Sequence, residues 1–274
     1  MLNRRLNDRF DVMPDLPQDA LTQFQTTHAE GCRTIAKTEF TPESIQIGIE
    51  VERHRWHWKP NQPRILLVAE SHVLTTDEDF NVRVREASIR PYLRPQATLP
   101  PDHFVRLVYC LAYGETDLLA APPAQFSNPG TPSYWDIFGR VAFRCPQPRQ
   151  QDGATFDDRM RWKVDTLREL YRMGIWLLDA SAHAIYRRND VRLSEAVQQT
   201  LHEEWWNGYG KFLIDSCESA KVWVIGKTVY KCLTNAGLNV YGGPRWVYQP
   251  NAQNVDLNQN WSELLKDCWE LRPD

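Results

Sequence analysis

The sequence has little that would assign it to a specialised class of protein. Its 274 residues include six cysteines, but no two have CxxC spacing, so neither a zinc knuckle nor an iron–sulfur site is indicated. Such cysteines are typical of reduced thiols inside a cytoplasmic protein. No apolar run approaches the roughly 20 residues of a membrane span, and the opening MLNRRLNDRF lacks the apolar segment of a signal peptide. We expect a cytoplasmic protein with no membrane partner, no metal and no cofactor.

The sequence also lacks an excess of positive charge. Its formal net charge of −3 gives no overall basic signal for nucleic acid, although a local basic groove is compatible with it. It has no internal repeat and no low-complexity block. The hydrophobic fraction of 42% is enough for one large core. We therefore predict one compact, monomeric unit, with an N-terminal arm and helical extension at 1–60 and an α/β domain at 61–274.

What the sequence does contain is a set of short apolar runs separated by helical patterns. The runs that predict strands are RILLVAE at 64–70, IWLLD at 175–179, KVWVIG at 221–226 and the start of RWVYQPNAQN at 245–254. Buried strands that alternate with helices predict a mainly parallel sheet covered on both faces. The expected fold class is α/β, a three-layer α/β/α sandwich with a central four-stranded sheet.

Helices are expected around these strands. They are predicted near residues 77–89, from 133 to 143, at 163–173, at 193–219 with a break near Gly208 and Gly210, at 227–237 and at 260–271. Ser133 is the expected cap of the second helix.

Other segments are less regular. The Pro-rich segment 121–133 reads as a loop, and residues 1–20 as an irregular arm. Two segments, 44–58 and 104–114, fit either a strand or a helix.

Unusual residues gather where the predicted strands end. These ends are AESH at 69–72, DAS at 179–181, GK at 226–227 and QPNAQ at 249–253. In parallel α/β sheets, ligands bind at the carboxyl ends of the strands. The sequence therefore predicts one site built from several loops.

Five segments, in this order, resemble motifs of the uracil-DNA glycosylase superfamily. They are VAESHV at 68–73, FSNPGTPSYWDIF at 126–138, GIWLLDASAHAI at 174–185, VWVIGKTVYKC at 222–232 and YQPNAQN at 248–254. The resemblance implies an enzyme that flips a nucleotide out of DNA and hydrolyses its N-glycosidic bond. DNA is then the expected partner.

The resemblance assigns roles to residues of the first two segments. Phe126 aligns with the aromatic residue that stacks on the flipped base. Glu70 aligns with a motif position from which a carboxylate could orient water or stabilise the sugar cation. Ser71 stands where one branch has its water-activating Asp, which leaves the mechanism open. His72 could contact phosphate or water. Val73 replaces a Tyr that blocks substituents on carbon 5 of the pyrimidine, so the pocket could admit one.

Further roles fall on the last segment and on basic residues. Gln249 replaces a catalytic His and could donate to a base carbonyl. Gln253 takes the place of the apolar wedge, and Asn251 could hold a phosphate. The other expected DNA contacts are Ser133, Lys227, Arg187 and Arg188, with Arg245 near the mouth and Arg83, Arg85, Arg90 and Arg94 on a nearby helix.

Asp179 stands where the superfamily has the Asn that reads uracil. An ionised Asp accepts hydrogen bonds only, so it repels O4 of uracil and accepts from the amino group of cytosine. If burial raised its pKa, the protonated acid could also donate to N3. With Val73, this predicts a 5-modified cytosine, hydroxymethylated or glucosylated as in some phage DNA, and hence a role in phage defence.

Three other interpretations stay open. The chain could be a repair glycosylase for uracil or a deaminated base. It could bind a flipped base without cleaving, because it lacks the Asp and His of the motifs. The resemblance could also reflect only a shared α/β fold, which does not fix function.

Overall fold

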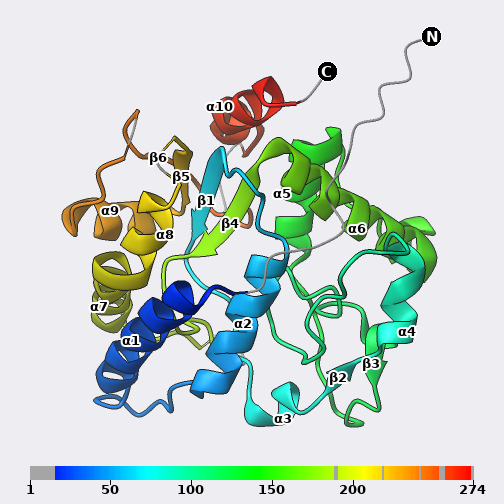
Figure 1. The fold of residues 1–274 in the computed structure, drawn as a ribbon, viewed down its shortest axis with the longest axis horizontal. Helices are drawn as coiled ribbons and strands as arrows, with labels where there is room; N and C mark the ends of the chain where they lie inside the picture. Colours follow the sequence, from blue (N-terminus) through cyan, green and yellow to red (C-terminus); the bar gives the residue numbers. More distant parts are fainter. Residues whose placement is uncertain (1–15, 188–190, 218, 241, 253–256, 273–274) are drawn as a thin grey trace.

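Four parallel strands form the centre of the molecule, in the order β4–β1–β5–β6 (Figure 1). The strands are β1 (Ile65–Ala69), β4 (Ile175–Asp179), β5 (Lys221–Ile225) and β6 (Arg245–Val247). The computed structural model describes residues 16–187, 191–217, 219–240, 242–252 and 257–272. Helices flank the sheet on both sides, which confirms the predicted three-layer α/β/α fold class.

Strands β1 and β4 are buried along their whole length because helices and loops cover both of their faces. Every residue of β1 and β4 is buried, as expected for a parallel sheet between helices. Helices α5 (Pro132–Phe143) and α6 (Phe156–Met173) lie to one side, and α9 (Lys227–Asn235) packs on β5. Helix α10 (Leu257–Glu270) packs against α5 and β6. The strands and these helices confirm the elements predicted for this part of the chain.

The N-terminal segment is helical and joins the same core. Helix α1 (Gln18–Ile35) begins inside the segment expected to be an irregular arm, and α2 (Ile45–His57) resolves the segment that fitted either a strand or a helix. Ser44 caps α2 by accepting from the backbone N–H of Ile47 (3.4 Å). Phe24 and Trp56 belong to the core cluster that contains the sheet. The covering of the sheet therefore extends into residues before 61.

The predicted break in the 193–219 segment is confirmed. Helix α7 (Glu195–Trp205) continues through a π-helical turn (Trp206–Gly210) into α8 (Lys211–Asp215). Gly208 has φ −120° and ψ −107°, which interrupts the helix, and a Cβ there would clash with Thr27 of α1. The break thus lets α1 cross close to this turn.

The prediction of one helix near residues 77–89 is wrong. The segment instead forms α3 (Asp77–Phe80), β2 (Arg83–Val84) and α4 (Glu86–Ile89). β2 pairs with β3 (Leu119–Ala120), so its backbone groups cannot take part in a helix. The capping box of Thr76 and Asp79 starts only a single helical turn.

Two further expectations are corrected. Residues 104–114 are neither strand nor helix but a series of turns, in which Cys110 N–H donates to Leu107 O and Tyr113 N–H to Cys110 O. Helix α5 begins at Pro132 after Thr131, so Ser133 lies in its first turn and is not its cap. Proline suits that first position because its missing N–H has no partner there in any case.

Short 3₁₀ turns complete the description, at Arg90–Tyr92, Thr116–Leu118 and Gln150–Asp152. Within the described part of the chain, no helix is both long enough and apolar enough to cross a membrane.

Candidate functional site

A small pocket opens where β1 and β4 end. Asp179, the last residue of β4, pairs in register with Ala69, the last residue of β1. The residues that follow β1 turn over this edge, so that Ser71, His72, Val73 and Asp179 line the pocket together with Arg106 and Tyr134. The structure thus brings together four of the residues predicted from sequence. The cavity has a volume of about 30 Å³, which is room for water only.

One carboxylate oxygen of Asp179 is fully occupied. Its Oδ2 accepts from Arg55 Nη2 (2.6 Å), from the backbone N–H of His72 (2.9 Å) and from His72 Nδ1 (3.0 Å). Across the described ranges, no residue hydrogen-bonds to Oδ1. Burial alone would raise the pKa of Asp179, but the Arg55 guanidinium and His72 outweigh burial and hold the pKa below its ordinary value. The condition for a protonated acid, a pKa raised by burial, is therefore not met: the group is ionised and only accepts.

His72 lies between two buried carboxylates. Its Nε2 is 3.0 Å from Glu43 Oε2, while Nδ1 faces Asp179. Burial lowers the pKa of His72, but Glu43 and Asp179 raise it to about 9, so the ring carries a positive charge at neutral pH. Both ring nitrogens are occupied and the side chain is buried. The expected contact of His72 with phosphate or water is therefore corrected, since neither nitrogen faces a ligand.

Glu43 is held in place from the backbone. Its Oε1 accepts from Thr75 N–H (3.0 Å) and its Oε2 from Ala184 N–H (2.8 Å). Burial would raise the pKa of Glu43, but His72 and these two donors lower it to about 2. This carboxylate connects the segment after β1 with the segment after β4.

These groups form one ion-pair network that comprises Glu43, His72, Asp179, Arg55 and Glu52. Arg55 donates to Glu52 as well as to Asp179, and Glu52 also accepts from the Tyr209 hydroxyl (2.7 Å). Three carboxylates face two cations, which leaves one net negative charge beside the pocket. Every member is buried.

Glu70 makes no hydrogen bond or ion pair with this network in the described structure and does not line the pocket. Its Oε1 accepts from Arg192 Nη2, whereas Oε2 is buried and has no hydrogen-bond partner in the described structure. The Arg192 guanidinium lies over the Tyr186 ring, 4.5 Å from its centroid. Burial, the negative charge of Glu70 and a side-chain hydrogen bond to that carboxylate raise the pKa of Tyr186. Oε2 is the oxygen of the predicted water-activating residue that the geometry leaves without a partner.

Tyr134 lies between Asp179 and Glu70. Its hydroxyl donates to Gln249 Oε1 (3.2 Å). Burial raises the pKa of Tyr134, and the charges of Asp179 and Glu70 raise it further, so the hydroxyl keeps its proton. The Gln249 amide NH₂ approaches Gly226, where a Cβ would lie 3.1 Å from Nε2. Gly226 (φ +110°) directly follows β5 and leaves room for this side chain. We call Glu70, Arg192, Tyr186, Tyr134 and Gln249 the Glu70 cluster.

Phe126 lies beside the pocket but not in its lining. Its ring packs edge-on against Phe104 (centroids 5.1 Å apart) and under the Arg106 guanidinium (5.8 Å). Arg106 is fixed by Asp79 through two hydrogen bonds of 2.9 and 3.2 Å, and by the Ser127 carbonyl. Arg106 lines the pocket and lies over the Phe126 ring, which does not line it.

The expected DNA contacts fall in different places. Lys227 and Asn251 are exposed and follow the carboxyl ends of β5 and β6. Ser133 is half-buried in the first turn of α5. Arg187 is buried, donates to the Thr41 carbonyl (3.1 Å) and lies over Phe40, so its expected contact with DNA is corrected. Arg188 and Gln253 lie outside the described residues.

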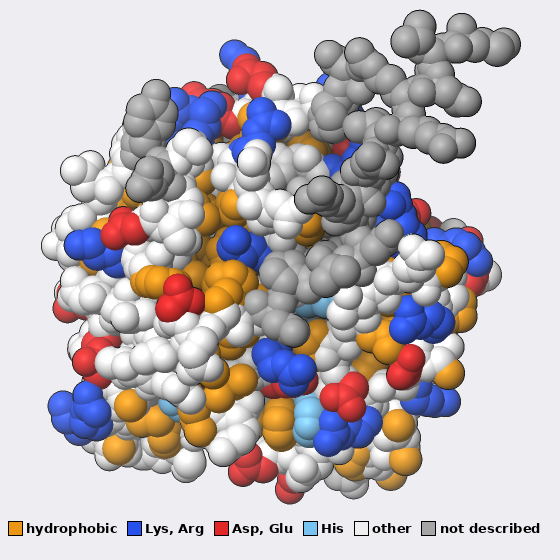
Figure 2. All heavy atoms as spheres, viewed as in Figure 1, with side chains coloured by type: hydrophobic (Ala, Val, Ile, Leu, Met, Phe, Trp, Pro, Cys, Tyr) orange, Lys and Arg blue, Asp and Glu red, His pale blue; other side chains and the backbone are white. Residues whose placement is uncertain are grey.

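The remaining arginines do not form the expected basic helix. Arg83 is in β2 and pairs with Asp102, whereas Arg90 pairs with Glu86. Arg85 donates to the Leu119 carbonyl, and Arg94 follows the 3₁₀ turn at 90–92. Arg245 begins β6 and pairs with Asp267 of α10, away from the carboxyl edge. On the face in Figure 2, the visible Lys and Arg side chains are scattered among acidic ones.

Sequence reasoning missed several residues of this site. Glu43 and Arg55 belong to the segment before residue 61. The sequence patterns gave no reason to place that segment at the predicted site. Tyr134 follows Ser133 directly, and its place in the Pro-Ser-Tyr turn after the loop was the available signal. Comparisons with protein-family models, with curated proteins and with solved structures find no match for this chain.

Proposed function

We propose that this chain is a DNA glycosylase that hydrolyses the N-glycosidic bond of a cytosine derivative flipped into the pocket beside Asp179. The observation that carries the proposal is the state of Asp179. It is ionised, its Oδ2 is fully occupied, and it lines a pocket at the carboxyl edge of a parallel sheet. The resemblance of the five sequence segments supports the choice of DNA as substrate.

Base recognition follows from the acceptor-only character of this carboxylate. The free Oδ1 accepts from the exocyclic amino group of cytosine and repels the O4 carbonyl of uracil. The net negative charge of the ion-pair network favours the same donor. Val73 lines the pocket and is small, which leaves space near carbon 5 for a substituent.

The Glu70 cluster supplies the chemistry in this proposal. Because Tyr134 occupies Oε1 of Gln249, the amide NH₂ is available to donate to the base carbonyl O2 as charge develops on the leaving base. The free Oε2 of Glu70 accepts a proton from water. The water oxygen bonds to C1′ of the sugar, the C1′–N1 bond breaks, and its electron pair leaves with the base.

The pocket must widen before a base can enter. Its volume of about 30 Å³ is far below the 300 Å³ or more of typical ligand sites. One wall contains Thr131, the last residue of the 121–131 loop that has no regular structure, and Tyr134 in the first turn of α5. We propose that this wall and Phe126 rearrange on binding, which would bring the Phe126 ring onto the base.

A base-release assay tests the proposal. Duplexes carrying a single cytosine, 5-hydroxymethylcytosine, glucosylated hydroxymethylcytosine or uracil are incubated with the protein, and free bases and abasic sites are measured by mass spectrometry. Release of a 5-modified cytosine, but not of uracil, is the expected result and would fit a role against phage DNA. Release of uracil alone would overturn the cytosine assignment. Tight binding without release would instead support the non-cleaving interpretation.

The pocket offers a matched pair of variants for the same assay. Val73→Tyr places a bulky ring near carbon 5 and should reduce release of glucosylated hydroxymethylcytosine much more than release of any smaller substrate. Val73→Ala should preserve both activities, because it does not narrow the pocket. If Val73→Tyr reduces the release of large and small bases equally, the 5-substituent does not lie beside Val73 as proposed.

A further inference from the structure

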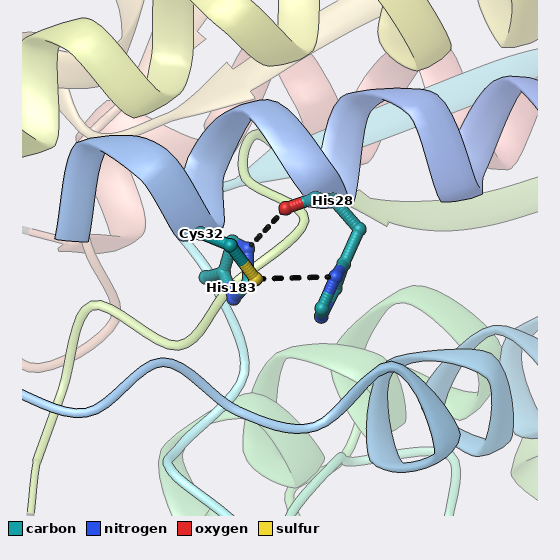
Figure 3. Close-up of side chains that lie close together, drawn as sticks. All are labelled: His28, Cys32 and His183. Carbon is teal, nitrogen blue, oxygen red and sulfur yellow. Dashed lines mark hydrogen bonds between the residues drawn. The ribbon is translucent and has the colours of Figure 1, made fainter. Parts of the chain in front are cut away.

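A second cluster of chemically reactive side chains lies outside the proposed site. His28 and Cys32 are one turn apart on α1, and His183 belongs to the segment that follows β4 (Figure 3). One candidate ligand atom from each residue lies within 4.8 Å of those of the other two. His28 and His183 are buried, while Cys32 is partly exposed. This trio contains two imidazoles and a thiol, the ligand types that zinc prefers.

The hydrogen bonds leave one ring nitrogen of each histidine, His28 Nε2 and His183 Nδ1, without a partner in the described structure. His183 Nε2 is 2.9 Å from the His28 carbonyl, which fixes that nitrogen as the donor and leaves Nδ1 unprotonated. Nδ1 of His183 is buried without a hydrogen-bond partner in the described structure. Cys32 Sγ is 3.6 Å from His28 Nδ1. Tetrahedral zinc, with bonds of about 2.3 Å to sulfur and about 2.0 Å to nitrogen, sets these two atoms roughly 3.5 Å apart.

The two imidazoles of the cluster pack against each other in the interior of the protein. The two rings lie close, with centroids 4.1 Å apart, and a protonated pair would repel. A hydrogen bond between the Cys32 thiol and His28 accounts for one contact, but it gives the buried His183 Nδ1 no partner.

Gly31 shows that the helix is shaped to receive the third residue. It lies between His28 and Cys32 in α1, where glycine disfavours helix formation. A Cβ at this position would clash with the His183 ring. The glycine therefore allows the imidazole to approach the helix surface between the two other ligands.

We infer that His28, Cys32 and His183 bind a divalent zinc ion, with a fourth position open toward the partly exposed side of Cys32. Such an ion would clamp α1 to the segment after β4. That segment also supplies the Ala184 N–H to Glu43, and the Tyr186 carbonyl, which accepts from Leu74 N–H (2.9 Å). The metal would thus hold one wall of the carboxyl edge in place. The CxxC criterion missed it because the third ligand comes from a distant segment.

Elemental mass spectrometry of the full chain, purified without chelator, tests this inference. About one zinc per chain is expected, and Cys32→Ser should reduce it several-fold. Cys145→Ser is the matched control, because Cys145 is an exposed thiol outside the cluster. Cobalt added to the metal-free protein should give a thiolate-to-cobalt charge-transfer band in wild type and in Cys145→Ser, but not in Cys32→Ser.

Thermal unfolding keeps the inference testable even if the ion is lost during purification. Adding zinc to chelator-treated wild type should raise Tm, with a much smaller rise in Cys32→Ser. Absence of zinc together with no zinc-dependent rise in Tm would overturn the inference. Stoichiometric copper or iron in place of zinc would overturn the assignment of the metal. Neither readout depends on glycosylase activity.

Discussion

The carboxyl edge has two halves, the ion-pair network and the Glu70 cluster, which differ in the number of hydrogen bonds that hold their carboxylates. In the ion-pair network, every charged group has an opposite partner, and His72 contacts Glu43 and Asp179 at 3.0 Å each. In the Glu70 cluster, Oε2 of Glu70 has no partner in the described structure, and the NH₂ of Gln249 makes no hydrogen bond to a described residue. Buried polar atoms are normally paired, and exceptions are candidates for ligand contacts.

The difference indicates that the ion-pair network has a structural role and that the Glu70 cluster has a catalytic one. The paired groups fix the positions of the segments that follow β1 and β4. Arg55 Nε has no partner in the described structure, but Arg55 does not line the pocket, so Oδ1 of Asp179 is the oxygen that remains to face a ligand. Unsaturated groups can bind water or substrate without first breaking an internal bond. Substitutions in the network should therefore reduce stability first, and substitutions in the Glu70 cluster should reduce activity first.

The largest effect is expected for Asp179→Asn. The change leaves Arg55 and His72 without their shared carboxylate, and breaking a buried pair in this way costs about 3–5 kcal/mol. Urea unfolding measures the loss of free energy of unfolding. Asp102→Asn is the control, because its exposed pair with Arg83 should cost less than about 1 kcal/mol. Similar small losses in both variants would remove the distinction between the two halves.

The charge on His72 makes the free energy of unfolding depend on pH. Its pKa is about 9 in the folded chain and near 6.5 when unfolded, so the folded state binds its proton more tightly. The stabilisation is complete below pH 6.5 and is lost as pH rises through 9, by roughly 3 kcal/mol at about 1.4 kcal/mol per pKa unit. Unfolding curves of wild type between pH 6.5 and 9.5 should show this loss. His72→Gln should be less stable at pH 6.5 and nearly flat across the same range.

The contrast between the halves also explains what the sequence could predict. The strands were predictable because continuous apolar runs such as IWLLD suit only buried elements. The position of Asp179 at a ligand-binding edge follows from the strand that it ends. Its partner Arg55 was not predictable, because it comes from α2, whose apolar pattern alone fitted either a strand or a helix. Ion pairs between distant segments depend on how the chain packs, and they cannot be predicted from a local sequence pattern.

The same limit applies to residues 77–89. Their polar pattern suits a helix, but the pairing of β2 with β3 depends on a segment more distant in the chain. Arg187 likewise looked like a surface cation, and only the fold reveals that Thr41 and Phe40 cover it.

Glu70→Gln should separate activity from stability. The amide keeps the size of the side chain, but it cannot take a proton from water, so base release should fall by about 100-fold or more. Free energy of unfolding should fall by less than in Asp179→Asn, because Arg192 is partly exposed and can be solvated when Glu70 is neutral. Single-turnover base release and urea unfolding measure the two quantities. Unchanged release would exclude Glu70 as the water-activating group.

Among these variants, Tyr134→Phe should reduce base release the least. It tests whether the Tyr134 hydroxyl orients the Gln249 amide. The variant keeps the ring that lines the pocket but removes the hydroxyl that holds Gln249 Oε1. One neutral hydrogen bond contributes about 1 kcal/mol, which predicts a loss of base release of about 5-fold. Gln249→Ala removes the donor itself and should cost more, about 10-fold or above. If Tyr134 acts only through Gln249, the double variant should release base no more slowly than Gln249→Ala. Additive losses would instead mean that the hydroxyl contacts the substrate directly.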